Sequence, residues 1–322
     1  MMRRRLLLGV CSLSLVLAAC AVPHQRDTTL DKVAARDADV AKVLRGYREV
    51  RNSAIELLDP KPLSTVETGP VLAIDTGSFE VSQRLAQTQK EDSGRVDVTA
   101  IETPRFAKYP LWFYAVVSDP ALGVNRVQIF ERETSADPWL LTASPQTLAD
   151  TELPDIRRRD GSAMRVAADD GTGMAMSPQE AADAYAAVLA DPAAKSSTIS
   201  EDSFIEQMRE AAATNGALDD VRFSQTWEAE DVEYALRTAD GGALAFVTFL
   251  RQDTYEVDEG LTITWPEGSP QQAFLSSGIA GSGQLNYYHQ VLIHLPGGTG
   301  KPRALGQYGG VVSADSGATT IR

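Results

Sequence analysis

This chain is poor in cysteine, in histidine and in long apolar runs. Its 322 residues include two cysteines, Cys11 and Cys20, and three histidines. The apolar run from Leu6 to Leu17 is shorter than the ~20 residues that a helix needs to cross a bilayer. A membrane-spanning helix is therefore the less favoured interpretation of this end of the chain.

Residues 1–19 have the layout of a secretory signal peptide. A basic start, Arg3-Arg4-Arg5, precedes the apolar run, and the small residues Ala18 and Ala19 follow it. Two arginines ahead of an apolar run are also similar to a twin-arginine export signal. The sequence predicts export and leaves the route open.

The residues Leu17-Ala18-Ala19-Cys20 resemble the lipobox of bacterial lipoproteins. The resemblance implies that the Cys20 thiol receives lipid (palmitate), that a peptidase cuts before it, and that residues 20–31 form a tether. It also implies anchoring at the outer face of the cell membrane. Since Cys11 leaves with the signal peptide and Cys20 carries the lipid, we expect no disulfide.

Negative charge is in excess. The formal net charge is −14, and removal of Arg3, Arg4 and Arg5 takes it to −17. Such a surface repels phosphates and anionic headgroups, so we expect no nucleic-acid partner, and a membrane partner only through the lipid anchor.

The rest of the chain shows one pattern twice, helices followed by strands. In the first half, apolar periodicity predicts a helix over 33–58, an extended piece at 69–75 and a helix over 78–90. Strands rich in aromatic and β-branched residues are predicted at 95–101, 109–118, 125–132 and 139–144.

The second half repeats this order. Ser177, Pro178 and Glu180 form a capping-box pattern that starts a helix, and a second helix is predicted from about Ser200 to Gly216. The predicted strands are 220–229, 232–239, 243–252, 261–266, 285–296 and 303–314.

The repeated pattern predicts an α+β fold of two tandem domains, each with helices packed on a curved antiparallel sheet. This arrangement resembles the NTF2-like or cystatin-like class. The expected parts are a first domain at 32–150, a glycine-broken linker at 151–176, a second domain at 177–316 and a tail at 317–322.

No catalytic, metal or cofactor site emerges from the motifs. His289 and His294 are five apart on one predicted strand, which places them on opposite faces. Residues 296–303 lack the spacing of a phosphate loop. The acidic run 228–233 is either a cation site or a solvated strand end, and the solvated end is favoured. We expect no enzyme, no cofactor and no metal.

An aromatic stripe on the predicted strands suggests a ligand-binding site. Trp112, Tyr114 and Tyr288 would line the concave face of such a sheet, where a small apolar ligand could bind. The alternative, which we favour, is that these rings fill the core between sheet and helices.

The segments YPLWFYAVVSDP and DGGALAFVTF, with the lipobox, resemble those of uncharacterised two-domain lipoproteins of high-GC Gram-positive bacteria. The resemblance implies location and architecture but no activity. The leading hypothesis is a binding or scaffold lipoprotein whose partner is an envelope protein. The alternative is a carrier of a small apolar or lipid ligand held between sheet and helices.

Overall fold

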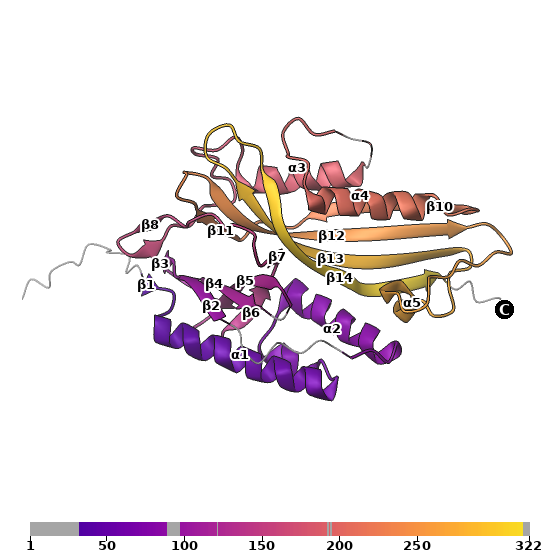
Figure 1. Ribbon diagram of the computed structural model, residues 1–322, viewed down its shortest axis with the longest axis horizontal. Coiled ribbons are helices and arrows are strands. Elements are labelled where there is room, and N and C mark those ends of the chain that lie inside the picture. Colours follow the sequence, from indigo (N-terminus) through magenta and orange to yellow (C-terminus); the bar gives the residue numbers. More distant parts are fainter. Residues whose placement is uncertain (1–31, 89–96, 121, 192, 194, 318–322) are drawn as a thin grey trace, which may run out of the picture. The chain divides into compact units, whose positions relative to one another are not determined.

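The computed structural model describes residues 32–88, 97–120, 122–191, 193 and 195–317 (Figure 1). The predicted signal peptide, Cys20 and the tether lie outside the described residues. Among the helices described, none is long and apolar enough to cross a membrane.

The helices begin where the sequence supplies start signals. Ser177 accepts a hydrogen bond from the Glu180 amide, and the Glu180 carboxylate accepts one from the Ser177 amide, which confirms the predicted capping box. Asp202 caps the next helix through Ile205 N. The helical elements are α1 (Asp37–Leu57), the 3-10 helix η1 (Lys61–Thr65), α2 (Gly69–Arg84), α3 (Pro178–Ala190), α4 (Ser203–Gly216) and α5 (Pro270–Phe274).

The strands form a mixed α+β architecture with one large antiparallel sheet. They are β1 (Lys32–Val33), β2 (Asp97–Glu102), β3 (Arg105–Phe106), β4 (Leu111–Asp119), β5 (Val124–Arg132), β6 (Leu140–Ala143), β7 (Gln146–Leu148), β8 (Arg158–Arg159), β9 (Ser162–Ala163), β10 (Val221–Ala229), β11 (Tyr234–Arg237), β12 (Ala243–Val257), β13 (Ser282–Leu295) and β14 (Arg303–Gly317).

The ten-stranded sheet contains strands from both halves of the chain. Its order is β10-β12-β13-β14-β7-β5-β4-β2, with β11 also paired to β12 and β6 to β5. The two halves join where Gln307 of β14 pairs with Gln146 of β7. Because β14 and β7 share a single residue pair at this junction, side-chain packing has to supply most of the free energy that holds the two halves together.

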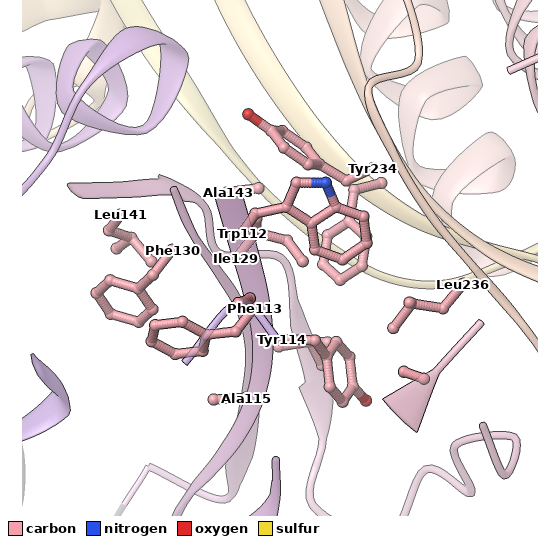
Figure 2. Packing of buried hydrophobic residues seen from close by; sticks show 14 of the residues in the cluster. Trp112, Phe113, Tyr114, Ala115, Ile129, Phe130, Leu141, Ala143, Tyr234 and Leu236 are labelled. Carbon is pink, nitrogen blue, oxygen red and sulfur yellow. The ribbon is translucent and has the colours of Figure 1, made fainter. Parts of the chain in front are cut away.

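That packing comes from one face of β4 and β5. Strand alternation sends Trp112 and Tyr114 to one face and Phe113 to the other. The Trp112 ring meets Tyr234 of β11 edge-on (Figure 2), at 5.6 Å between centroids. Tyr114 meets Phe246 of β12 at 6.1 Å. One hydrophobic cluster therefore spans both halves.

The opposite face of β4 and β5 packs on helix α1. Phe113 stacks on Phe130 at 5.2 Å, and Tyr47 of α1 meets Phe130 edge-on at 5.6 Å. On the other half of the sheet, α3 and α4 lie side by side over the long strands (Figure 1). The helices thus cover the faces of the sheet that the contact between the two halves does not bury.

The two tandem domains and the NTF2-like or cystatin-like fold are not confirmed. The strands of both halves share one sheet, and the described residues from 32 to 317 belong to one compact unit. Within the expected linker, Val166 N donates to Ala235 O, and Met164 O accepts from Arg237 N. A glycine-rich sequence pattern does not reveal such pairing, because backbone hydrogen bonds do not depend on side-chain type.

Helix α2 corrects the expectation of an extended piece at 69–75. Pro70 stands in the first turn, where its missing N–H costs no hydrogen bond. Val71, Ile74 and Phe79 follow at near-helical spacing and are buried. The helix crosses β14 at Gly77, where an added Cβ would lie 2.2 Å from the carbonyl oxygen of Val311.

The prediction of a strand at 261–266 is also wrong. Ile263 makes only an isolated bridge with Ile279, and Trp265 packs edge-on against Tyr255 at 5.3 Å. The apolar residues of this segment belong to a loop that packs on the sheet, which buries them in part. The short helix α5, which the sequence analysis missed, follows this loop.

A buried cluster of polar groups ties α1 and α2 to the C-terminal strand. Arg51 Nη1 lies 2.7 Å from Asp75 Oδ2 and 4.0 Å from Glu67 Oε1. Tyr47 donates its hydroxyl proton to Glu67 Oε1 at 3.0 Å, and Tyr308 of β14 donates to Asp75 Oδ1. We call these five residues the buried carboxyl cluster.

Candidate functional site: an acidic pocket between the halves

A pocket of about 350 Å³ lies between the strands of the two halves and the start of α2. Its volume is at the lower end of the ~300–1,000 Å³ of small-ligand sites. The lining residues are Thr68, Gly69, Pro70, Glu131, Thr142, Ala143, Pro145, Glu230, Asp231, Glu233, Tyr234, Phe246, Val247, Thr248, Gln290 and Val291. We call this space the acidic pocket.

Four carboxylates line the acidic pocket, and no lysine, arginine or histidine is among its lining residues. Glu131 lies near the end of strand β5. Glu230, Asp231 and Glu233 belong to the turn between β10 and β11. The turn brings three acidic side chains over the opening, because Tyr234 and Val232 anchor it by their burial. The pocket therefore presents concentrated negative charge beside apolar walls.

Glu131 is the carboxyl that the fold perturbs most at this site. Burial, with a smaller contribution from the negative charges of Glu133 and Glu233, raises its pKa to about 7, while a hydrogen bond from Tyr234 opposes the rise. The Tyr234 hydroxyl donates to Glu131 Oε2 at 2.9 Å. Burial also raises the pKa of Glu230, with Glu233 and Glu228 adding to the effect.

These groups can stabilise a positive charge that enters the pocket. Removal of a carboxylate from water favours its neutral form, and an adjacent cation restores the ionised form. The rings of Tyr234 and Phe246 add apolar surface and π-electron density. Within the described part of the chain, no group of three or more His, Cys, Asp or Glu side chains is placed to hold a metal ion.

The aromatic residues predicted to bind a ligand lie one layer behind this pocket. Trp112 is 4% exposed and Tyr114 2% exposed, and neither lines the pocket. They pack instead against Tyr234 and Phe246, which do line it (Figure 2). Trp112 and Tyr114 thus fix the position of the pocket's aromatic wall.

Tyr288, the third predicted residue, is half-buried on β13. Its pKa is raised by burial, with the charge of Glu230 adding to the effect, and it does not line the acidic pocket. Gln290 is two positions further along the same strand and lines the pocket. The structure does not bring Tyr288 into ring contact with Trp112 or Tyr114.

The two histidines lie away from the acidic pocket. His289 is buried between Trp227 and Tyr287, and burial lowers its pKa to about 3, with the charge of Arg251 adding to the effect. His294 lies 3.5 Å from Asp240 at the hairpin turn. Each has its own neighbours, as opposite faces of one strand require.

Sequence reasoning missed Glu131, Tyr234 and Gln290 as pocket residues. The signal that pointed closest to them was the acidic run 228–233, for which a cation site was the less favoured interpretation. Three of its carboxylates line the pocket. Glu131 gave no signal, because its partner Tyr234 is 103 positions away in the chain.

Comparison with known proteins finds relatives without an assigned role. The chain is 27% identical over 263 residues to an uncharacterized lipoprotein of Streptomyces avermitilis, with 79% of this chain and 76% of the relative covered. It is 26% identical over 294 residues to an uncharacterized lipoprotein of Streptomyces coelicolor, with 84% and 82% covered. No solved structure matches the chain significantly.

A family model described as a domain of unknown function, DUF8094, matches residues 32–316 without a break. The match runs through both halves of the sheet, including the acidic pocket and the buried carboxyl cluster. The chain belongs to the DUF8094 family.

Proposed function

We propose that this chain is a lipid-anchored, non-catalytic binding protein of the cell envelope, held at the outer face of the cell membrane through Cys20. The lipoprotein names of the two Streptomyces relatives and the lipobox support the location. The acidic pocket supports the binding role. Its occupant is a basic side chain of an envelope protein, an ammonium or guanidinium group on an apolar stem.

One observation carries the proposal: a partly buried carboxyl beside aromatic rings, in a pocket with no cation of its own. The Glu131 carboxylate accepts a hydrogen bond from the Tyr234 hydroxyl, and no basic residue lines the pocket around it. Three further carboxylates line the opening. An entering cation would relieve the repulsion among them, and its apolar stem would contact Tyr234 and Phe246.

The test is isothermal titration of the purified protein with two tripeptides, acetyl-glycyl-lysyl-glycinamide and its norleucine analogue. We expect the lysine peptide to bind at least about tenfold more tightly, because only its side chain carries a charge. Glu131→Gln should weaken lysine binding, while Glu228→Gln, at the end of strand β10 and outside the pocket lining, should not. Equal affinity for the two peptides would contradict the proposal.

The second candidate is a carrier of a small apolar or lipid ligand. The observation in its favour is the apolar part of the lining, from Phe246 to Val247 and Val291. Native mass spectrometry of the protein purified from its own membrane distinguishes the two. A stoichiometric apolar ligand that is displaced by the norleucine peptide, and equally by the lysine peptide, supports the carrier.

The anchor has its own test. Cys20→Ala removes the thiol that accepts lipid, and we expect the variant to leave the membrane fraction for the soluble fraction. Retention of the variant in membranes would overturn the lipid anchor without affecting the binding experiments.

A further inference from the structure

A second pocket, of about 210 Å³, lies between helix α1 and the first-half strands on the face opposite the acidic pocket. It shares no lining residue with the acidic pocket. Its lining residues are Ala41, Leu44, Arg45, Tyr47, Arg48, Val98, Val117, Arg126 and Gln128. We call it the arginine pocket.

The geometry of α1 and the sheet explains why these side chains meet. Ala41, Leu44, Arg45 and Arg48 follow the i, i+3, i+4, i+7 spacing of one helix face. On the sheet, Val98, Val117 and Arg126 occupy one cross-strand row, since Val98 pairs with Val117 and Val117 with Arg126. A helix face and a strand row, each made of aliphatic residues and arginine, therefore face each other.

The charge of the arginine pocket is opposite to that of the whole chain. Three arginines and no carboxylate line it, in a protein with a formal net charge of −14. Arg126 is 6% exposed and lies 3.5 Å from Asp119, which offsets its charge. Across the described residues, Arg45 and Arg48 form none of the ion pairs.

The remaining lining residues are apolar, apart from Tyr47 and Gln128. Leu44 and Val117 contribute aliphatic surface, and Val98 stays 46% exposed although it is a large apolar side chain. The Tyr47 hydroxyl is engaged by Glu67 of the buried carboxyl cluster. A ligand in this pocket would meet apolar surface inside and positive charge at the opening.

We infer that the arginine pocket binds a single-chain amphiphile with one carboxylate head group, such as a free fatty acid. Arginine side chains hold carboxylates through paired N–H donors. A water-sized group takes about 30 Å³, so the volume holds about seven methylene-sized groups, which is most of one medium-length chain and not two chains. This site is independent of the proposed function of the acidic pocket.

The test is photocrosslinking of the full chain, purified in nonionic detergent, with a decanoic acid that carries a diazirine. We expect crosslinked peptides from α1 and β2, and competition by decanoate but not by decanol. The double variant Arg45→Gln/Arg48→Gln should lose about tenfold or more of the labelling, because each charged hydrogen bond contributes more than a neutral one.

The matched control is Lys42→Gln, which removes a positive charge from the same helix outside the lining of the arginine pocket. It should keep the labelling, and all variants should keep the wild-type melting temperature. Equal labelling of the double variant, or equal competition by decanol, overturns the inference. Arginine-dependent sedimentation with phosphatidylglycerol vesicles, in the absence of decanoate-competed labelling, also overturns it and assigns the arginines to a membrane surface.

Discussion

The acidic pocket and the buried carboxyl cluster both contain a glutamate with a raised pKa, yet they differ in what surrounds it. The pKa of Glu67 rises to about 9, chiefly through burial and the negative charge of Asp75, and that of Glu131 to about 7. Around Glu67 the fold supplies Arg51, Tyr47 and Tyr308. Around Glu131 it supplies the Tyr234 hydroxyl and an open pocket without a basic lining residue.

This difference separates a structural role from the binding role that we propose. In the buried carboxyl cluster, the arginine that balances the carboxylates belongs to the protein, and neither Glu67 nor Asp75 lines the acidic pocket or the arginine pocket. In the acidic pocket the balancing cation is missing from the lining. A raised pKa alone therefore does not mark a site, whereas a raised pKa beside a cavity without its own counter-charge does.

The largest effect should follow from removal of the internal cation. Arg51→Ala leaves Asp75 buried without its partner, and we expect a loss of about 3–5 kcal/mol in the free energy of unfolding. Urea denaturation measures this loss. Arg48→Ala, three residues earlier on the same helix, is the control and should change stability by less than about 1 kcal/mol. Similar losses in both variants would remove the distinction between the two regions.

The pH dependence of stability should separate Glu67 from Glu131. Each binds a proton more tightly in the folded chain than in the unfolded chain, whose glutamates titrate near 4.5. The stabilising contribution of each is full below that value and is lost as pH rises, through about 7 for Glu131 and about 9 for Glu67.

Glu67→Gln mimics the protonated side chain, so the variant should lack the part of the decline between pH 7 and 9. Thermal unfolding across this range measures the effect, with Glu131→Gln as the control that keeps the decline. Persistence of the full decline in the Glu67 variant would assign it to another group.

Binding to the acidic pocket should depend on pH in the opposite sense. Ionised Glu131 attracts a cation and protonated Glu131 does not, so the lysine peptide should bind more tightly at pH 8 than at pH 5.5, with a midpoint near 7. Titration calorimetry at several pH values measures this. The Glu131→Gln variant should show a flatter profile, and an unchanged midpoint in that variant would exclude Glu131 as its source.

The smallest effect should come from the Tyr234 hydroxyl at the acidic pocket. Tyr234→Phe removes the proton that Tyr234 donates to Glu131, at a cost of about 1 kcal/mol in the free energy of unfolding. Since that hydrogen bond lowers the pKa of Glu131, the variant should raise it. Carbon-13 titration of the glutamate carboxyls measures the shift, and a downward shift would contradict the assigned hydrogen bond.

Much of the local structure was predictable because local signals encode it. The capping box at Ser177 starts α3, and the alternating segments on either side of Asp240 become β11 and β12. The start of α2 was missed because residues 69–75 carry a glycine and a proline that are typical of an extended piece. Packing of α2 on β14 at Gly77 outweighs that weak preference.

The candidate site was predictable only in part. An aromatic face was expected and exists, but Trp112 and Tyr114 fill the layer behind Tyr234 and Phe246. Which of two aromatic layers faces a cavity depends on how far the sheet halves stand apart. That separation is a property of the packed molecule, and no local pattern of residues encodes it.

The sequence by itself determined the α+β composition, most of the strands and helices, and the lipobox pattern around Cys20, which lies outside the described residues. These features depend on neighbours within a few positions of each other. Only the tertiary structure decided that both halves share one sheet, and that Glu131 meets Tyr234 while Arg51 meets Asp75. Such pairs join distant positions, and burial, which sets their charge, exists only after the chain has folded.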